Sequence, residues 1–271
     1  MLPIGNLHTH TCFCDGKDSP EEILREAIAQ GLDTLGFSGH AYVEGDEECC
    51  MSPERTEEYR AEIGRLRALY GDRIHLLCGI ERDYYSPLDR GGYDYVIGGV
   101  HYLRLDGELY PLDLRADVLR ALIREHFAGD PVALARAYYE RVAELPEKTE
   151  CDVIAHFDLI TKFNERDPVF DETDPRYLRV ALDTLDALLE QDKIIEINTG
   201  AVSRGYRRTP YPVPILLRRI AEKGGRVIFG SDSHSKETLL FGRSEAIHLA
   251  RAAGIGSMTC LTPSGWQSYP I

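Results

Sequence analysis

The sequence lacks any stretch of about 18 apolar residues, the length that a membrane-spanning helix requires. It also lacks a basic-then-apolar segment of the kind that directs secretion. Positive charge is scarce, with 31 lysines and arginines against 45 aspartates and glutamates and a formal net charge of −14. A surface that follows the phosphates of long nucleic acids needs the opposite sign. We therefore expect a cytoplasmic protein that binds neither membranes nor long nucleic acids.

The seven cysteines form no regular framework. Cys12-Phe13-Cys14 and Cys49-Cys50 lack the Cys-x-x-Cys spacing of zinc ribbons and redox centres. We expect reduced thiols, with metal ligation by Cys14 as an alternative. The sequence also has no P-loop and no Ser-His-Asp arrangement, and the pairs Gly91-Gly92 and Gly98-Gly99 lack the spacing of a GxGxxG element. These absences exclude several common sites for phosphate binding and nucleophilic catalysis.

Apolar strand-like runs alternate with amphipathic helical stretches through most of the 271 residues. This alternation is typical of βα units, and single α/β barrels commonly have about 250 residues. Helix starts are clearly marked. Ser19 is a capping residue, Pro20 suits the first helical position, and Glu22 completes a capping box. Because no linker or internal repeat is present, we predict a single α/β domain over residues 1–271.

The predicted strands are short and mostly end at a polar residue. They cover residues 2–4, 34–38, 74–80, 93–100, 153–155, 194–197, 227–230 and 258–261. Helices are expected to begin near residues 20, 53, 131, 175 and 215, and a last one is expected over residues 235–253. Residues 102–130 read as a long connection that contains some helix.

Histidines and acids follow the predicted strands. His8 and His10 stand at i and i+2, so a strand would present their two imidazoles on the same side. The full set of residues in such positions is His8, His10, His40, Glu81, His101, His156, Asp232 and His234. In a parallel barrel the carboxyl ends of the strands meet at one mouth. Burying many carboxylates there without a cation is costly, so this pattern predicts a divalent metal site.

Each of these residues also has a plain alternative when it is taken alone. His156 could bond a backbone carbonyl at the end of its strand. Glu81 could pair with Arg82 or Lys162, and Asp232 could cap the helix that follows it. The metal-site hypothesis depends on all of them occupying the same kind of position.

Together these segments resemble the motif series of the PHP (polymerase and histidinol phosphatase) superfamily. The segments are His8-x-His10, residues 36–40, 79–81, 98–101 and 154–156, and Gly230-Ser231-Asp232-Ser233-His234. They occur in the order found in that family and extend over nearly the whole chain. The resemblance implies a distorted (β/α)7 TIM-like barrel that holds a cluster of two or three divalent metal ions.

The resemblance also assigns the ligands by position. One metal would be held by His8, His10, Glu81 and Asp232, and a second by Glu81, as a bridge, with His101 and His156. His40 and His234 would hold a third metal together with a residue soon after the first motif. Many relatives have a histidine there, whereas this chain offers Asp15. Because an oxygen ligand makes the third site harder, manganese or iron becomes an alternative to zinc.

A cluster of this kind suits phosphate ester hydrolysis. Three divalent ions bring a charge of about +6, and the carboxylates of Asp15, Glu81 and Asp232 bring about −3. The remainder would neutralise a phosphate monoester dianion and one hydroxide. A clustered site also lowers the pKa of bound water toward neutrality. We therefore expect attack on phosphorus by a metal-bridging hydroxide.

Basic residues near the ligand positions are candidate phosphate ligands. The loop after Asn198 carries Arg204 and Arg207, and Lys162 follows His156 by six positions. The alternative is that these side chains are merely solvated. In histidinol phosphatases of the superfamily, an arginine similarly follows an Asn-Thr-Gly segment, and a basic residue follows the His156 motif. On this resemblance we rank Arg204 first and Lys162 second.

The expected activity is therefore hydrolysis of L-histidinol phosphate, a small phosphate monoester. Asp232 and His234, or a metal-bound water, would protonate the leaving alkoxide. Contacts to an imidazole and an ammonium group could come from Tyr42, Glu44, Asp83, Tyr84 and Tyr102. Two rival functions remain open: a phosphoesterase of the same family that acts on nucleotides or short oligonucleotides, and a module whose metals only stabilise the fold. The sequence leaves the oligomeric state open.

Overall fold

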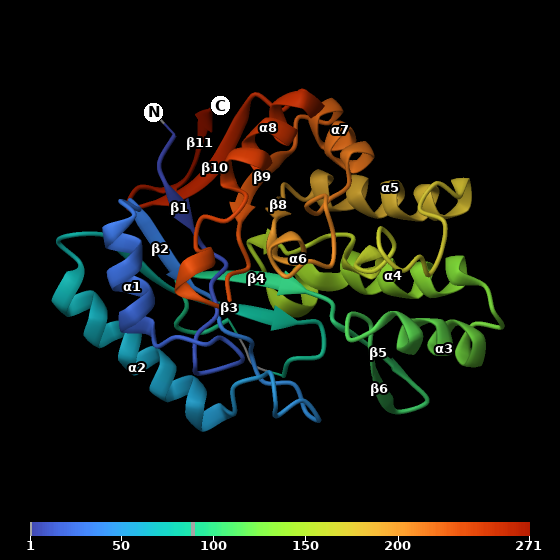
Figure 1. Cartoon of the computed structure of the whole chain (residues 1–271), viewed down its shortest axis with the longest axis horizontal. Helices are drawn as coiled ribbons and strands as arrows, with labels where there is room; N and C mark the ends of the chain where they lie inside the picture. Colours follow the sequence, from blue (N-terminus) through green and yellow to red (C-terminus); the bar gives the residue numbers. More distant parts are fainter. Residues whose placement is uncertain (1, 88–89) are drawn as a thin grey trace.

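The structure, a computed structural model, describes residues 2–87 and 90–271 (Figure 1). Its centre is a seven-stranded parallel sheet with the order β1-β2-β3-β4-β7-β8-β9. The strands are β1 (Gly5–Asn6), β2 (Thr34–Phe37), β3 (His75–Asp83), β4 (Tyr95–Gly99), β7 (Val153–Ile154), β8 (Ile194–Asn198) and β9 (Arg226–Gly230). The expected parallel α/β arrangement is confirmed, and the observed strand bounds lie close to the predicted ones, except that the first strand is Gly5–Asn6 and not residues 2–4.

The first and last strands of this sheet meet just beyond their carboxyl ends. Thr9 and Ser233 form a parallel β-bridge. The backbone N–H of His10 donates to the Ser233 carbonyl at 2.8 Å, and that of Ser233 donates to the His8 carbonyl at 3.2 Å. Nearby, the Asn6 amide donates to Ser231 Oγ at 2.8 Å. The sheet is thereby nearly closed into the distorted seven-stranded barrel that the sequence predicts.

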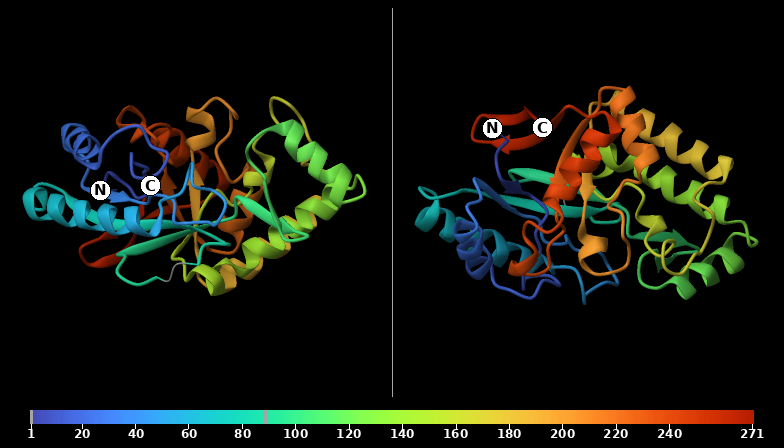
Figure 2. Two further views of the ribbon diagram at one scale, coloured as in Figure 1. Left: turned by 90° about the horizontal axis from the view of Figure 1, so that it is seen from below. Right: turned by 45° about the horizontal axis from the view of Figure 1, so that its top comes forward.

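Helices pack around the outside of the barrel and bury the outer face of the sheet (Figures 1 and 2). They are α1 (Pro20–Ala29), α2 (Pro53–Tyr70), α4 (Pro131–Thr149), α5 (Pro175–Glu190), α7 (Pro214–Glu222) and α8 (Arg243–Ala253). The connections contain a further helix, α3 (Ala116–His126), and three shorter ones: α6 (Gly200–Ser203), η1 (Leu159–Thr161) and η2 (Lys236–Thr238). Among the described residues, no helix is both long and apolar enough to cross a membrane.

Several helices begin where the sequence places them. The Ser19 side chain accepts from the Glu22 N–H, and Glu22 bonds back to the Ser19 N–H, which completes the capping box. The side chains of Ser52, Asp130 and Asp174 each accept from a backbone N–H at the start of α2, α4 and α5, and a proline follows each of these residues. These local signals mark the starts of α1, α2, α4 and α5 independently of the barrel.

Two hairpins lie outside the barrel sheet. Within the stretch read as a connection, β5 (Tyr102–Leu105) pairs with β6 (Glu108–Pro111) around an Asp106-Gly107 turn. The strand expected at residues 258–261 is β10 (Ser257–Thr262). It pairs antiparallel with β11 (Gly265–Pro270) instead of joining the barrel. Figure 2 shows this second hairpin beside the N-terminal segment.

The helix predicted over residues 235–253 is broken into two pieces. The turn η2 is separated from α8 by Gly242, which has φ 71°. This left-handed conformation interrupts the helical backbone and is available to glycine at little cost. A side chain at Gly242 would also collide with Thr199, because its Cβ would lie 2.8 Å from Thr199 Cγ2. The break therefore keeps the segment close to the loop that follows β8.

Apolar side chains fill the interior of the barrel below its mouth. Tyr95, Ile97, Val153 and Ile228 are buried there. The Tyr95 hydroxyl donates to the carbonyl of Phe37 at 2.9 Å. Because the lower half is packed with side chains, the polar residues after the strands are concentrated at the C-terminal mouth.

Candidate active site

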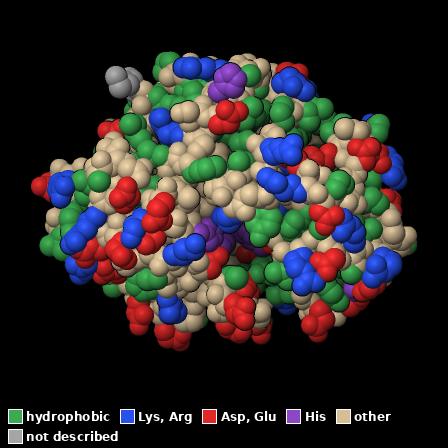
Figure 3. Space-filling view, viewed as in Figure 1, with side chains coloured by type: hydrophobic (Ala, Val, Ile, Leu, Met, Phe, Trp, Pro, Cys, Tyr) green, Lys and Arg blue, Asp and Glu red, His purple; other side chains and the backbone are tan. Residues whose placement is uncertain are grey.

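Every predicted metal ligand except Asp15 lies in or just after a barrel strand, and all of them meet at the mouth. His8 and His10 follow β1, and their ring centroids are 5.2 Å apart. The other ligands come from β3 and from the segments after β2, β4, β7 and β9: His40, Glu81, His101, His156, Asp232 and His234. Figure 3 shows histidine side chains at the bottom of a hollow near the middle of one face.

Glu81 lies at the centre of this group and is 1% exposed. Its Oε2 atom is 3.1 Å from His8 Nε2, 3.4 Å from His10 Nε2 and 3.1 Å from His40 Nδ1. Its Oε1 atom is 3.1 Å from His156 Nε2. The two oxygens of one carboxylate thus face two different sets of imidazoles, which is the geometry that a bridging ligand requires.

Asp232 also faces the histidine pair. Its Oδ1 atom is 3.2 Å from His10 Nε2 and 3.6 Å from His8 Nε2. Its Oδ2 atom accepts a hydrogen bond of 2.8 Å from Arg204 Nη2. The backbone at Asp232 has φ 49°, a left-handed conformation that aims the carboxylate into the mouth. One oxygen therefore faces the imidazoles while the other holds a cationic side chain.

Asp15 joins the histidines predicted for the third site. Its Oδ2 atom is 3.1 Å from His234 Nε2, and its Oδ1 atom is 3.9 Å from His40 Nε2. His10 Nδ1 is also near, at 3.7 Å from Asp15 Oδ1 and 3.6 Å from the sulfur of Cys14. Ligand atoms from Asp15, His40, His234 and His10 all lie within 4.8 Å of one another.

The donor set fits a cluster of divalent cations. Two further triads have ligand atoms within the same 4.8 Å limit, His8-His10-Asp232 and Glu81-His101-His156. His8 Nε2, His10 Nε2 and Glu81 Oε2 are buried and make no hydrogen bond within the described part of the chain. Buried polar atoms of this kind are costly unless they have a partner. A cation between them would satisfy all three, and mixed imidazole and carboxylate ligands suit zinc, manganese or iron.

The electrostatics keep Glu81, Asp232 and His10 in metal-binding protonation states. Burial opposes protonation of His8 and His40, but neighbouring carboxylates raise the pKa of both, so these two imidazoles must lose a proton when metal binds. Burial raises the pKa of Glu81, but the neighbouring His8 and His40 outweigh this effect and hold that pKa well below its usual range. Burial likewise opposes ionisation of Asp232, yet Arg204 and His8 lower its pKa. Burial, with His234 and His40 nearby, lowers the pKa of His10 to about 3. Ionised carboxylates beside a neutral His10 are the forms that bind metal.

Two acids that the sequence did not mark as ligand-orienting residues hold the imidazoles in place. Glu196, on β8, has its Oε1 atom 2.6 Å from His8 Nδ1, and its Oε2 atom accepts from the His156 N–H at 3.1 Å. Asp83 Oδ2 lies 3.2 Å from His101 Nδ1. Hydrogen bonds of this kind fix the tautomer and the direction of a metal-ligating histidine. The signal for Glu196 was a lone charge within the apolar run 194–197.

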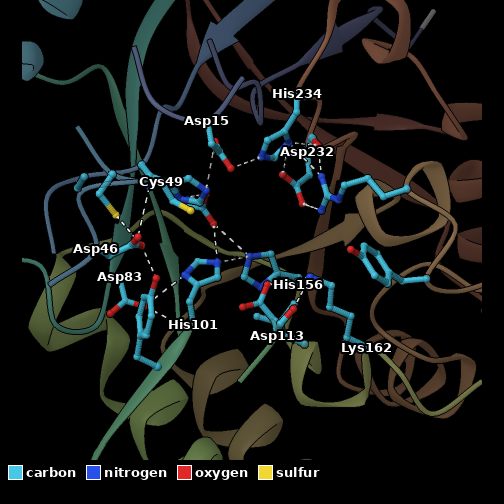
Figure 4. A pocket seen from close by; sticks show the side chains of 18 residues that line it. Asp15, Asp46, Cys49, Asp83, His101, Asp113, His156, Lys162, Asp232 and His234 are labelled. Atoms are coloured by element: carbon cyan, nitrogen blue, oxygen red, sulfur yellow. Dashed lines mark hydrogen bonds and ion pairs between the residues drawn. The ribbon is translucent and has the colours of Figure 1, made fainter. Parts of the chain in front are cut away.

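The ligands open into a cavity of about 230 Å³. Figure 4 shows the imidazoles and Asp232 at its centre, Lys162 and Asp113 on one wall, and Asp46 and Cys49 on another. Lys162 Nζ is 2.9 Å from Asp113 Oδ2. Two of the predicted phosphate ligands, Lys162 and Arg204, line this cavity. Of the residues suggested for imidazole and ammonium contacts, Asp83 and Tyr102 line it, whereas Tyr42, Glu44 and Tyr84 do not.

Arg207 has a different place from the one predicted. Its side chain is 1% exposed and is not part of the cavity lining. Its Nη1 atom donates to the carbonyl and the hydroxyl of Thr161, each at 2.6 Å, and its Nη2 atom pairs with Glu165 at 3.2 Å. Arg207 therefore joins the loop after β8 to the segment after β7. A structural role replaces the predicted phosphate contact.

Several known proteins that are similar to this chain are named histidinol-phosphatases. Probable histidinol-phosphatases of Deinococcus radiodurans and Schizosaccharomyces pombe are each 30% identical to this chain. The matches cover 96% and 86% of this chain and 97% and 81% of those proteins. The crystal structure of the histidinol phosphate phosphatase of Lactococcus lactis, complexed with zinc, L-histidinol and phosphate, has the same fold. Its TM-score is 0.72 at 21% identity, over 98% of this chain and 100% of that one.

The family itself is established by residues 6–200, which match the PHP domain. This range contains the ligands from His8 to His156, and the barrel places Asp232 and His234 beside them. The resemblance drawn from the motif series is thereby confirmed, and the chain belongs to the PHP domain family.

Proposed function

We propose that this protein hydrolyses L-histidinol phosphate to L-histidinol and inorganic phosphate, a step of histidine biosynthesis. The proposal rests on the convergence of imidazoles and carboxylates around Glu81 in a cavity whose wall carries Lys162 and Arg204. Relatives that match along most of this chain bear the name histidinol-phosphatase. A protein of the same fold binds zinc, L-histidinol and phosphate together.

Two or three divalent ions belong to this proposal, with zinc, manganese and iron as the candidates. The ligand groups would be His8, His10 and Asp232; Glu81, His101 and His156; and Asp15, His40 and His234, with Glu81 as the bridge. Such ions, when bound, supply a nucleophilic hydroxide at neutral pH and positive charge for the phosphoryl oxygens.

The cationic side chains of the chain itself orient the ester. Arg204 is held at the rim by hydrogen bonds of 2.9 and 2.8 Å to the carbonyl and Oδ2 of Asp232. Its planar guanidinium suits paired contacts to phosphate oxygens. Lys162 adds a second positive charge from the wall that it shares with Asp113 (Figure 4). With the phosphate held by these two groups, its phosphorus would face the imidazole cluster.

The leaving alkoxide must receive a proton. Asp232 is ionised in this site, so we assign this step to His234, with a metal-bound water as the alternative donor. His234 Nδ1 lies 3.6 Å from Asp232 Oδ1 and 3.0 Å from Arg204 Nη1 at the cavity wall. The proton donor and the phosphate ligand would therefore lie side by side, and the departing oxygen would remain within reach while the phosphate is held.

Phosphate release should be measured with metal-replete protein on L-histidinol phosphate, nucleoside monophosphates and a dinucleotide. We expect kcat/KM to be at least about a hundredfold higher for the first, the selectivity expected of a site with buried polar contacts to its substrate. Chelation should abolish turnover, and added divalent metal should restore it. Equal rates on nucleotides would indicate that the protein is a nucleotide phosphoesterase instead. No turnover on any substrate would leave only a structural role for the metals.

The remaining assignments are part of the same proposal. A small phosphate monoester is the partner, one domain covers residues 1–271, and the reaction takes place in the cytoplasm. Acidic composition, with a net charge of −14, supports the exclusion of long nucleic acids.

A further inference from the structure

Asp113 lies on the cavity wall in the connection between β6 and α3. Lys162 Nζ donates to its Oδ2 at 2.9 Å and to its backbone carbonyl at 2.8 Å. The carboxylate remains 27% exposed. Figure 4 shows the two side chains together beneath His156. An ion pair thus lines the wall next to the imidazole cluster, with a negative and a positive group adjacent to each other.

The ion pair leaves binding capacity on both partners. A lysine ammonium has three N–H donors, and Asp113 receives two hydrogen bonds from Lys162. One donor therefore remains for a phosphoryl oxygen. On the acid, no hydrogen bond within the described part of the chain uses Oδ1 of Asp113. This oxygen can accept from a bound cation while Oδ2 keeps its contact with Lys162.

The other acids on the outer wall of the cavity are already occupied. Asp83 Oδ1 accepts from the Tyr85 N–H at 2.8 Å, and its Oδ2 accepts from the His101 N–H at 2.8 Å. Asp46 Oδ1 accepts from the Cys49 N–H at 3.3 Å, and its Oδ2 accepts from the Tyr102 hydroxyl. Both carboxylates hold the wall together through these bonds. Asp113 is the acid best placed to bind a ligand.

We propose that Asp113 binds the α-ammonium group of the substrate while its partner Lys162 binds a phosphoryl oxygen. This inference rests on the proposed function. In L-histidinol phosphate the ammonium stands on the carbon next to the ester methylene, so its two charged groups are also neighbours. The ammonium group of the substrate would face Asp113, and its phosphate group would face Lys162. Asp113 would then select phosphate esters that carry an adjacent ammonium group.

The position of the lysine is fixed from a second side. Lys162 Nζ lies 4.6 Å from the centroid of the Tyr206 ring, a cation–π contact, and Tyr206 also lines the cavity. Lys162 can therefore stay in place when Asp113 is altered. A change at Asp113 would then act mainly on the ammonium group, and a pair of substrates can separate this effect from effects on phosphate binding.

The test compares L-histidinol phosphate with 3-(imidazol-4-yl)propyl phosphate, which lacks only the ammonium group. Wild-type protein should prefer the first by about tenfold to a hundredfold in kcat/KM, the range for a hydrogen bond between charged groups. Asp113→Asn should lose that preference by lowering kcat/KM for L-histidinol phosphate alone. Asp106→Asn is the matched control, since Asp106 is 90% exposed in the β5–β6 turn and has φ 50°, which asparagine tolerates.

Calorimetry with L-histidinol and the corresponding alcohol without the ammonium gives a readout that needs no turnover. We expect wild-type protein, but not Asp113→Asn, to bind L-histidinol more tightly. Equal rates of wild-type protein on both esters would overturn the subsite and leave the proposed function intact. An equal loss on both esters in Asp113→Asn would also overturn it, because Asp113 would then act through Lys162. Wild-type protein inactive on L-histidinol phosphate would instead contradict the proposed function itself.

Discussion

Glu196 Oε1 lies 2.6 Å from His8 Nδ1 inside the barrel, and both side chains are 1% exposed. This contact directs His8 Nε2 toward Glu81 and Asp232, the two carboxylates at the centre of the cluster. Space for the Glu196 carboxylate comes from Gly230, where a Cβ atom would lie 1.8 Å from Glu196 Oε1. Glu196, inside the barrel, thus sets the direction of His8, a predicted metal ligand at the mouth.

Replacing Glu196 with glutamine should therefore weaken metal binding. We expect a loss of affinity of about tenfold to a hundredfold, as is usual when the partner of a metal-ligating histidine is changed. Zinc competition against a chelating dye measures it. Glu190→Gln is the control, because Glu190 is exposed at the end of α5. An unchanged zinc affinity in Glu196→Gln would show that Glu196 does not orient His8.

Asp232→Asn should abolish turnover and leave the fold intact. Asparagine tolerates the left-handed backbone at φ 49°, but it loses the negative charge that faces His10 and Arg204. We expect kcat/KM to fall by more than about a hundredfold, with circular dichroism unchanged. Asp192→Asn shares this backbone conformation at φ 56° and should behave as wild type, since Asp192 is 80% exposed. Wild-type rates in Asp232→Asn would remove Asp232 from the site.

Arg207→Ala should destabilise the protein. Removing the buried guanidinium takes away its hydrogen bonds to Thr161 and its ion pair with Glu165, and breaking a buried ion pair costs about 3–5 kcal/mol. Urea denaturation measures the free energy of unfolding. Arg208→Ala, at an exposed neighbouring position, should change it by less than about 0.5 kcal/mol. Equal stabilities of the two variants would contradict the structural role of Arg207.

Cys78 should make the protein less stable at alkaline pH. Burial, and secondarily Asp94, raise the pKa of this thiol from 9.0 to about 12. Below pH 9 the thiol is protonated in both states, and its contribution is fully present. Between pH 9 and 12 only the unfolded chain ionises, so the free energy of unfolding falls by about 1.4 kcal/mol per pH unit.

The measurement is urea denaturation from pH 8 upward. In Cys78→Ala the free energy of unfolding should fall less steeply with pH than in wild type, by the contribution of one ionising thiol. Cys12→Ala, at an exposed thiol, serves as the control. Parallel declines in wild-type protein and Cys78→Ala would mean that the thiol ionises as readily in the folded state as in the unfolded chain.

The ligands could be predicted from sequence because each signal is local. An apolar run followed by His40, His101 or His156 marks the end of a buried strand, and the strand ends of a parallel barrel meet at one mouth. The helix starts at Ser19 and Ser52 are equally local. The seven-stranded distorted barrel, by contrast, was implied only by the family resemblance, because periodicity gives no information about neighbours in the sheet.

Residues that act across the sheet could not be predicted in this way. The role of Glu196 depends on the barrel closing between β9 and β1, which brings β8 near His8, and that of Arg207 depends on contact with the segment after β7. Asp113 follows a hairpin in a stretch that has no clear periodicity. One signal there went unused: Asp106-Gly107, with φ 50° and 90°, is the turn sequence that most favours a two-residue hairpin.

The Thr9–Ser233 bridge brings together ligands from opposite ends of the chain. His8 and His10 are translated more than 220 residues before Asp232 and His234. A nascent chain that ends before β9 therefore has the histidine pair but lacks the carboxylate that faces it. We expect full metal loading only after β9 has folded beside β1, and bound ions would then hold these two distant segments together.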